Sequence, residues 1–238
     1  MFSGRRRRFS QQRVWRKLFP LFILSILFYI CRGLWLWNDR RSSSFAVATL
    51  LVNSDTYVKG ALVLGKSIQL LLKNQTNNND HIEMICMVTE NVNNDYRDLL
   101  QSVGWQTKVV PSLSNPNATI NARFKDTFTK LNAWRLTKYN KVLLLDADIV
   151  AVKSFKELFD LRINKKRIAA VADCCDKFNS GVVLLKPDKQ IFDDMIEKTV
   201  HPDFSSYDGG DQGFLNQYFK NSWIRLAYKY NAQLPDYI

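Results

Sequence analysis

The chain has 238 residues and a formal net charge of +12, with 34 Lys or Arg against 22 Asp or Glu. Residues 1–41 hold ten of these bases and one acid, Asp39, which gives +9 and leaves 24 bases and 21 acids, or +3, for the rest. A nearly balanced remainder argues against a nucleic-acid partner, because surfaces that bind nucleic acid carry a concentrated excess of Lys and Arg.

Residues 1–17 are basic and precede a run without charged side chains from Leu18 to Cys31. Counted to Trp37 the stretch has 20 residues, about the length that spans a bilayer. The positive-inside rule places the basic flank in the cytosol. We therefore expect a basic cytosolic tail (1–17), a signal-anchor transmembrane helix (18–37) and a short stem (38–44).

These features predict a single-pass type II protein of the Golgi or another secretory-pathway membrane, with residues 45–238 in the lumen. Two glycosylation acceptor sequences, at Asn74 and Asn117, agree with a lumenal position. A cleaved signal peptide stays open as the alternative, because the uncharged run before Arg32 is also as short as a signal-peptide core.

The remaining residues alternate between strand-like and helix-like patterns. Apolar runs predict strands, and helical spacing predicts helices between them. The strands are expected over 45–52, 82–88, 107–111, 142–145, 168–172 and 182–185. The helices are expected over 58–72, 94–100, 126–139 and 188–200, with a last one from the second half of 208–219. Asp126 or Thr127 is expected to cap the helix of 126–139. This order predicts one α/β domain with a mostly parallel central sheet.

The stretch KVLLLDADIVAV (141–152) ends an apolar strand in two carboxylates, Asp146 and Asp148. Two hard oxygen ligands at the carboxyl end of a parallel strand suit Mn²⁺ or Mg²⁺, with nucleotide phosphates completing the shell. The same letters also fit a phosphotransferase in which Asp146 is the nucleophile. A plain strand end is the third interpretation.

Two further segments carry polar groups beside glycines. In CDKFNSGVVLLKP (175–187), Asn179 and Ser180 present an amide and a hydroxyl that can bind sugar hydroxyls, although Asn-Ser-Gly is also an ordinary turn. In YDGGDQGFLN (207–216), Asp208 and Asp211 flank two glycines at the start of a predicted helix. A helix cap explains the acids, whereas glycines let the backbone approach a ligand closely.

Together, DAD, FNSG and DGGDQG resemble the glycogenin-like members of glycosyltransferase family 8 over residues 45–230. The segments TLLVNSDTYVKGALVLGKSI and FTKLNAW are similar to the nucleotide-binding opening and the lysine-bearing segment of that family. The resemblance implies a GT-A (Rossmann-like) fold that binds a UDP-sugar and retains the anomeric configuration.

Carried over residue by residue, the resemblance implies four groups of site residues. The uridine would contact Leu51, Asn53, Ser54 and Tyr57, although glycogenin has Thr-Asn at 53–54. The phosphates or sugar would face Lys130 and Arg123. Asp146 and Asp148 would hold the cofactor, which is Mn²⁺ or alternatively Mg²⁺, and Ala147 would lie against it. The donor sugar would be surrounded by Asn179, Ser180, Asp208, Asp211 and Gln212, the last three in catalytic positions. Asp211 would act as a transient nucleophile, or Asp211 and Gln212 would stabilise an oxocarbenium-like centre.

One departure from the family affects the expected activity. Family members carry a histidine metal ligand after the DGGDQG helix and a core strand, and neither His81 nor His201 matches it. The chain is therefore expected to be C-terminally truncated or to lack the third ligand. The expected partners are a UDP-sugar, a carbohydrate or glycoconjugate acceptor and the membrane, with a homodimer left open. A catalytically inactive lumenal module that binds nucleotide sugars remains the alternative function.

Overall fold

The computed structural model describes residues 44–52, 55–73, 81–116, 125–173 and 175–233. Its strands are β1 Phe45–Leu51, β2 Ile82–Val88, β3 Gln106–Val109, β4 Lys141–Leu145, β5 Ile168–Ala172, β6 Phe178–Leu185 and β7 Trp223–Leu226. The α-helices are α2 Asp55–Lys73, α3 Asn94–Ser102, α4 Lys189–Lys198 and α5 Asp211–Tyr218. Short 3₁₀ helices are η2 Thr127–Arg135, η3 Lys156–Asp160, η4 Pro202–Phe204 and η5 Tyr228–Tyr230.

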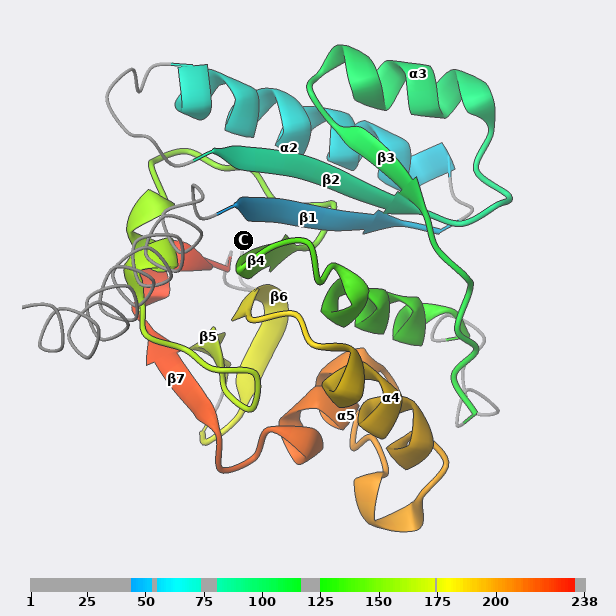
Figure 1. Cartoon of the computed structure of the whole chain (residues 1–238), viewed down its shortest axis with the longest axis vertical. Coiled ribbons are helices and arrows are strands. Elements are labelled where there is room, and N and C mark those ends of the chain that lie inside the picture. Colours follow the sequence, from blue (N-terminus) through cyan, green and yellow to red (C-terminus); the bar gives the residue numbers. More distant parts are fainter. Residues whose placement is uncertain (1–43, 53–54, 74–80, 117–124, 174, 234–238) are drawn as a thin grey trace, which may run out of the picture. The chain divides into compact units, whose positions relative to one another are not determined.

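The strands form one seven-stranded sheet in the order β3-β2-β1-β4-β6-β5-β7 (Figure 1). β1 pairs in parallel with β2 and β4, β2 with β3, and β5 with β7. Only β6 runs antiparallel to its neighbours β4 and β5. The prediction of an α/β domain with a mostly parallel sheet is confirmed. Because β1 and β4 are parallel neighbours, their carboxyl ends meet at one edge, where open α/β sheets bind ligands.

Helices cover both faces of the sheet, with α2 and α3 on one side and η2, α4 and α5 on the other (Figure 1). β4 shows how the sequence serves both layers: Leu143 and Leu145 belong to the core under α2, and Val142 and Leu144 to the core under η2. A strand that is buried on both faces has a continuous apolar sequence rather than an alternating one. This is why four apolar residues precede the two carboxylates.

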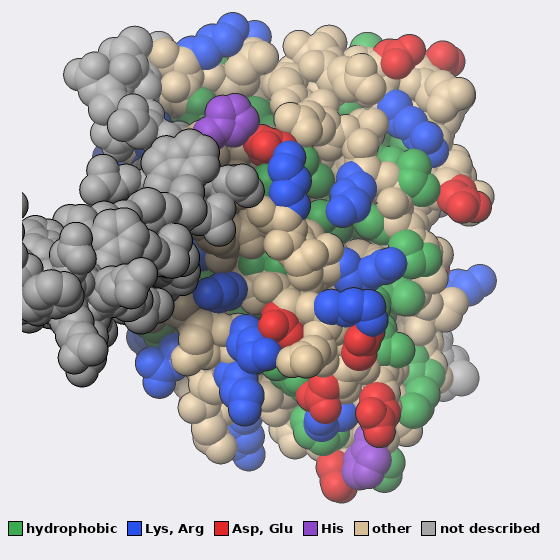
Figure 2. Space-filling model, in the orientation of Figure 1, with side chains coloured by type: hydrophobic (Ala, Val, Ile, Leu, Met, Phe, Trp, Pro, Cys, Tyr) green, Lys and Arg blue, Asp and Glu red, His purple; other side chains and the backbone are tan. Residues whose placement is uncertain are grey.

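The surface charges of this domain are mixed in sign. On the face shown in Figure 2, Lys and Arg side chains are interspersed with Asp and Glu. Ion pairs such as Lys138–Glu83 at 3.0 Å and Lys189–Asp193 at 2.6 Å join opposite charges at the surface. A mixed surface of this kind does not concentrate positive charge as a nucleic-acid-binding face does.

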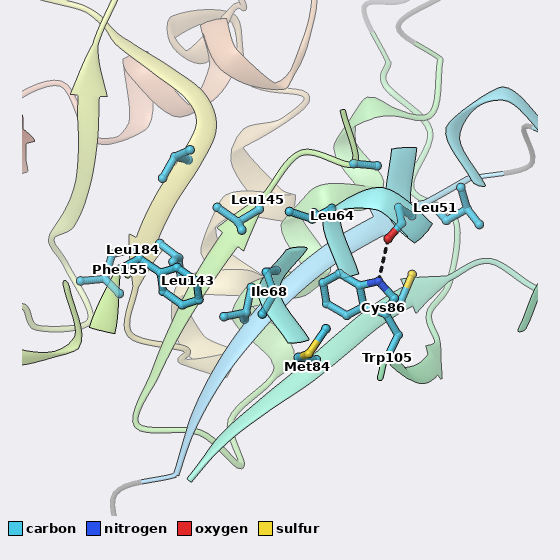
Figure 3. Packing of buried hydrophobic residues seen from close by; sticks show 14 of the residues in the cluster. Leu51, Leu64, Ile68, Met84, Cys86, Trp105, Leu143, Leu145, Phe155 and Leu184 are labelled. Atoms are coloured by element: carbon cyan, nitrogen blue, oxygen red, sulfur yellow. Dashed lines mark hydrogen bonds between the residues drawn. The ribbon is translucent and has the colours of Figure 1, made fainter. Parts of the chain in front are cut away.

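Trp105, which follows α3, fixes the packing of α2 on the sheet. Its side chain is 2% exposed, and its indole N–H donates to the carbonyl of Ala61 at 2.8 Å (dashed line in Figure 3). Gly65 faces the same ring, and a Cβ at that position would overlap the indole. The glycine therefore lets α2 lie close against Trp105, next to Leu64 and Ile68 (Figure 3).

Several predicted boundaries differ from the observed ones. The predicted helix of 126–139 is the shorter 3₁₀ helix η2, and Asp126 precedes it without a side-chain capping hydrogen bond. Strand β6 begins at Phe178, four residues earlier than predicted, so FNSG lies inside a strand and the turn interpretation is wrong. The edge strand β7 was not expected. Strand β2 has the predicted bounds, as does β5.

The predicted tail and signal anchor lie outside the described residues, as do the sequons at Asn74 and Asn117 and nearly all of the predicted stem. Among the residues that the structure describes, no helix has the length and apolar character needed to cross a membrane.

Candidate functional site

A cavity of about 540 Å³ lies at the carboxyl ends of β1 and β4, in front of the N-terminus of α5. Five separate stretches of the chain contribute predicted site residues to its lining. From α2 and η2 come Tyr57 and Lys130, from the turn after β4 come Asp146, Ala147 and Asp148, and from β6 and the α5 region come Ser180, Asp208, Asp211 and Gln212.

Lys130 is a buried cation below this cavity, with only 7% of its surface exposed. Its Nζ lies 2.6 Å from Asp146 Oδ1 and 3.1 Å from Asp211 Oδ2, and it donates to the Ser180 carbonyl at 3.0 Å. Burial would lower the pKa of Lys130, but the two carboxylates outweigh burial and raise it above the usual range. A charged lysine thus ties the strand-end carboxylate to the start of α5.

The environment of Asp146 shows how the negative charge at the end of β4 is compensated. Burial raises the pKa of Asp146 above its usual value, and the nearby charges of Asp211 and Asp148 add to this effect, while Lys130 opposes it. The side chain is still 42% exposed, because it faces the cavity. Lys130 compensates one carboxylate, and the remaining negative charge favours a bound cation.

Asp211 and Gln212 begin α5 and reach back to β6. Ser180 Oγ donates to Asp211 Oδ2 at 3.1 Å, and Ser180 N donates to Gln212 Oε1 at 3.0 Å. The resemblance placed all three residues around one donor sugar, and the structure brings Ser180 within hydrogen-bond distance of both Asp211 and Gln212. The early start of β6 is what carries Ser180 to this position.

Asp208 lines the cavity but has a structural task as well. Its Oδ1 accepts hydrogen bonds from Ser206 Oγ at 2.7 Å, Gly210 N at 2.8 Å and Gly213 N at 3.0 Å. The bonds from Gly210 N and Gly213 N satisfy backbone donors at the start of α5, which is the helix-cap interpretation of the acid. Gly209, which lies between Asp208 and Gly210, has φ 75°, a conformation that favours glycine.

The donor set fits a divalent cation in part. Asp146 and Asp148 both line the cavity, and carboxylate oxygens are the ligands that Mn²⁺ and Mg²⁺ take together with nucleotide phosphates. Within the described ranges, no group of three or more His, Cys, Asp or Glu side chains is arranged to hold a metal. These residues therefore supply two ligands, and a bound diphosphate would supply others.

The other predicted site residues are not among those that line the cavity. Leu51 is 1% exposed and packs in the core under α2, whereas its neighbours Leu50 and Val52 line the cavity. Asn179 Oδ1 accepts hydrogen bonds from Gly181 N and Asn231 Nδ2, both at 2.8 Å. Predictions for three more residues lie outside the described ones: Asn53, Ser54 and Arg123.

Sequence reasoning missed Asp126 and Thr127 as cavity residues, and it missed the role of Gly60 in α2. A Cβ on Gly60 would lie 2.5 Å from the carbonyl oxygen of Ala147, which is backbone and cannot rotate away. The glycine therefore sets how closely α2 approaches the turn of 146–148. A glycine inside a helical apolar pattern was the only sequence signal for this contact.

Replacing Gly60 with Ala is expected to lower the free energy of unfolding by about 1–3 kcal/mol, the usual cost of overpacking. Alanine in a helix interior normally stabilises by ~1 kcal/mol, so a loss would show that the clash decides the sign. The variant should also bind UDP with Mn²⁺ more weakly, because the carboxylates move with the turn. Urea unfolding and calorimetry measure both effects. Lys59→Ala, at an exposed neighbouring position, should change neither, and a stabilised Gly60→Ala would contradict the close contact.

This fold is shared with solved structures of low sequence identity. The galactosyltransferase LgtC in complex with donor and acceptor sugar analogues aligns with a TM-score of 0.58 and 19% sequence identity, over 77% of this chain and 74% of that chain. The fold is therefore α/β and GT-A-like.

The chain belongs to glycosyl transferase family 8, whose profile matches residues 48–237. It is 36% identical over 178 residues to inositol phosphorylceramide glucuronosyltransferase 1 of Arabidopsis thaliana, which covers 75% of this chain and 30% of that protein. It is 34% identical over 193 residues to the glycogenin of Neurospora crassa, over 78% of this chain and 26% of that protein. The chain thus spans about a third or less of the length of these relatives.

Proposed function

We propose that this protein transfers a sugar from a UDP-sugar to a carbohydrate or glycoconjugate acceptor, with retention of the anomeric configuration and with Mn²⁺ as cofactor. The observation that carries the proposal is Lys130, buried between Asp146 and Asp211 below a cavity that Asp148 also lines. This arrangement joins the carboxylates proposed to hold the metal to the residues expected at the sugar. Membership in family 8 supports the reaction class.

The residues of this chain divide the donor among them. Tyr57, half-exposed on the cavity wall, would pack beside the uracil, and Lys130 would neutralise phosphate charge from below. Asp146 and Asp148 would hold Mn²⁺, which when bound supplies positive charge that stabilises the departing diphosphate. Ser180, Asp211 and Gln212 would face the sugar, because Ser180 donates hydrogen bonds to both other residues and all three line the cavity.

Retention leaves two routes open at Asp211. In both, the bond from sugar C1 to the UDP oxygen breaks, and a bond from C1 to an acceptor oxygen forms on the same face. One route passes through a covalent bond from Asp211 to C1, and the other through an oxocarbenium-like centre stabilised by Asp211 and Gln212. Lys130 and Ser180 both donate to Asp211 Oδ2, so they would orient this carboxylate in either route.

The names of the relatives indicate which donor sugars to test first. Relatives are named as a glucuronosyltransferase acting on inositol phosphorylceramide, as a UDP-glucuronate:xylan glucuronosyltransferase and as glycogenin. Glucuronate and glucose are therefore the first donors to test. The acceptor is a proposal of class only, because this chain corresponds to a fraction of each of these proteins.

The experiment titrates UDP into the full chain with and without Mn²⁺ by calorimetry, and then follows UDP release from UDP-glucuronate, UDP-glucose, UDP-galactose and UDP-xylose. Mn²⁺-dependent binding with turnover of one donor is the expected result. Binding without turnover would favour the inactive nucleotide-sugar-binding module instead. No binding would overturn the proposed function. A phosphotransferase based on Asp146 has little support, because three strands precede β4 in the sequence.

The cellular setting is proposed from the sequence alone. A basic tail, a signal anchor over 18–37 and a lumenal catalytic part would place the protein in the Golgi or another secretory-pathway membrane as a type II protein. Protease protection of the full chain in sealed microsomes tests the orientation. Cleavage of residues 45–238 by an external protease would contradict it.

Replacing Tyr57 with Ala is expected to weaken UDP binding roughly tenfold, because stacking of a base on an aromatic ring contributes about 1–3 kcal/mol. Its side chain is 47% exposed at the cavity, so the fold should be unaffected. Calorimetric titration of UDP at fixed Mn²⁺ measures the change. Tyr228→Ala, an exposed tyrosine away from the cavity lining, is the matched control. Unchanged UDP affinity in Tyr57→Ala would mean that the uracil lies elsewhere.

A further inference from the structure

The loop between β5 and β6 lies against the segment that leads into α5. Asp173 N donates to the Lys177 carbonyl at 2.9 Å and closes the hairpin. Lys177 Nζ lies 3.5 Å from the centroid of the Tyr207 ring, within the range of a cation–π contact. Gln212 Nε2 donates to Asp173 Oδ2 at 3.0 Å and to Tyr207 OH at 3.3 Å.

These contacts determine which way the Gln212 side-chain amide points. Its oxygen accepts from Ser180 N at 3.0 Å, and its nitrogen donates to Asp173. If the amide were turned by 180°, its oxygen would face the Asp173 carboxylate and its NH₂ would face the Ser180 N–H. Both contacts would then be repulsive, because acceptor would meet acceptor and donor would meet donor. Asp173 and Ser180 together therefore select one orientation.

We propose that Asp173 is a positioning residue, which holds the Gln212 amide in this orientation at the donor-sugar pocket. This inference rests on the proposed function for its effect on turnover, although the orientation itself does not. Asp173 is exposed, so the fold does not need its side chain for packing. A fixed amide matters for transfer, because displacing a group at the reacting centre by about 1 Å can lower the rate roughly a hundredfold.

The test compares Asp173→Leu, which cannot accept a hydrogen bond, with Asp173→Asn, which keeps an acceptor oxygen. Asp176→Asn, an exposed carboxylate in the same loop, is the matched control. In the full chain labelled with ¹⁵N at glutamine, the Gln212 NH₂ signals are identified by their loss in Gln212→Leu. They should shift in Asp173→Leu and stay in place in the control. The kcat of Asp173→Leu should fall roughly tenfold, with UDP affinity unchanged, and Asp173→Asn should recover most of it.

The outcomes separate this inference from the proposed function. Unshifted Gln212 signals in Asp173→Leu would overturn the inference, whatever the turnover. Shifted signals with an unchanged kcat would also overturn it, because the hydrogen bond would then have no effect on transfer. If the wild-type chain turns over no donor, the proposed function fails, and a shifted signal would still support the orienting contact. A fall in UDP affinity equal to the fall in kcat would contradict a role confined to the sugar.

Discussion

A Lys130→Met variant is expected to lose measurable turnover and to unfold with a free energy about 1–3 kcal/mol below that of the wild type. Methionine fills a similar volume but leaves Asp146 and Asp211 without their shared cation, so two carboxylates would repel each other across the space that Nζ occupies. The stability loss is held below the largest values for broken buried pairs, because Asp146 is 42% exposed to the cavity and water screens it in part.

Urea unfolding measures the stability, and UDP release measures turnover. Lys125→Met removes an exposed lysine in the loop before η2 and should be neutral in both assays. Added Mn²⁺ should recover part of the lost stability of Lys130→Met, because a bound cation would again compensate Asp146. Wild-type turnover in Lys130→Met would show that Lys130 has no role at the donor site. A variant that is as stable as the wild type would show that the carboxylates do not depend on it.

The main elements of the fold were predictable because their sequences carry strong periodic signals. β1, β2, β4 and β5 are short, nearly continuous apolar runs, which is the pattern of strands buried on both faces. Strand β7 was not predicted, because it is a four-residue edge strand in which only Leu226 is buried. Seven of the nine residues of η2 are buried, so they lie on all sides of the helix. A helix buried on all sides has no apolar periodicity that would distinguish a 3₁₀ helix from an α-helix.

The candidate site was predictable in its residue types but not in its connections. The three motifs identified Asp146, Ser180 and Asp211 from segments far apart in the sequence. Nothing in the sequence showed that one lysine would join them, because this depends on β6 lying beside β4 in antiparallel register. The choice of Leu51 over Leu50 depended on which face of β1 turns toward α2, and a strand with apolar residues on both faces gives no such signal.

An Asp148→Ala variant is expected to lose roughly a thousandfold in Mn²⁺-dependent turnover while unfolding at the wild-type urea concentration. Asp148 is exposed in the turn after β4 and lines the cavity, and in the part of the chain that the structure describes it forms no hydrogen bond or ion pair. Its removal should therefore change stability by less than about 0.5 kcal/mol. A lost metal ligand removes several kcal/mol of charge stabilisation from the departing diphosphate, and each 1.4 kcal/mol is tenfold in rate.

The comparison with Asp146→Ala makes this test specific for the metal. Asp146→Ala would remove a metal ligand and also leave Lys130 with one carboxylate fewer, so it should lose both turnover and stability. Asp148→Ala should lose turnover alone, and its UDP affinity should no longer respond to Mn²⁺ in calorimetric titrations. Asp176→Ala, at an exposed carboxylate outside the cavity lining, controls for the loss of one negative charge. Near-normal turnover in Asp148→Ala would mean that the two carboxylates do not share a cation, and Asp146 would then act only as the partner of Lys130.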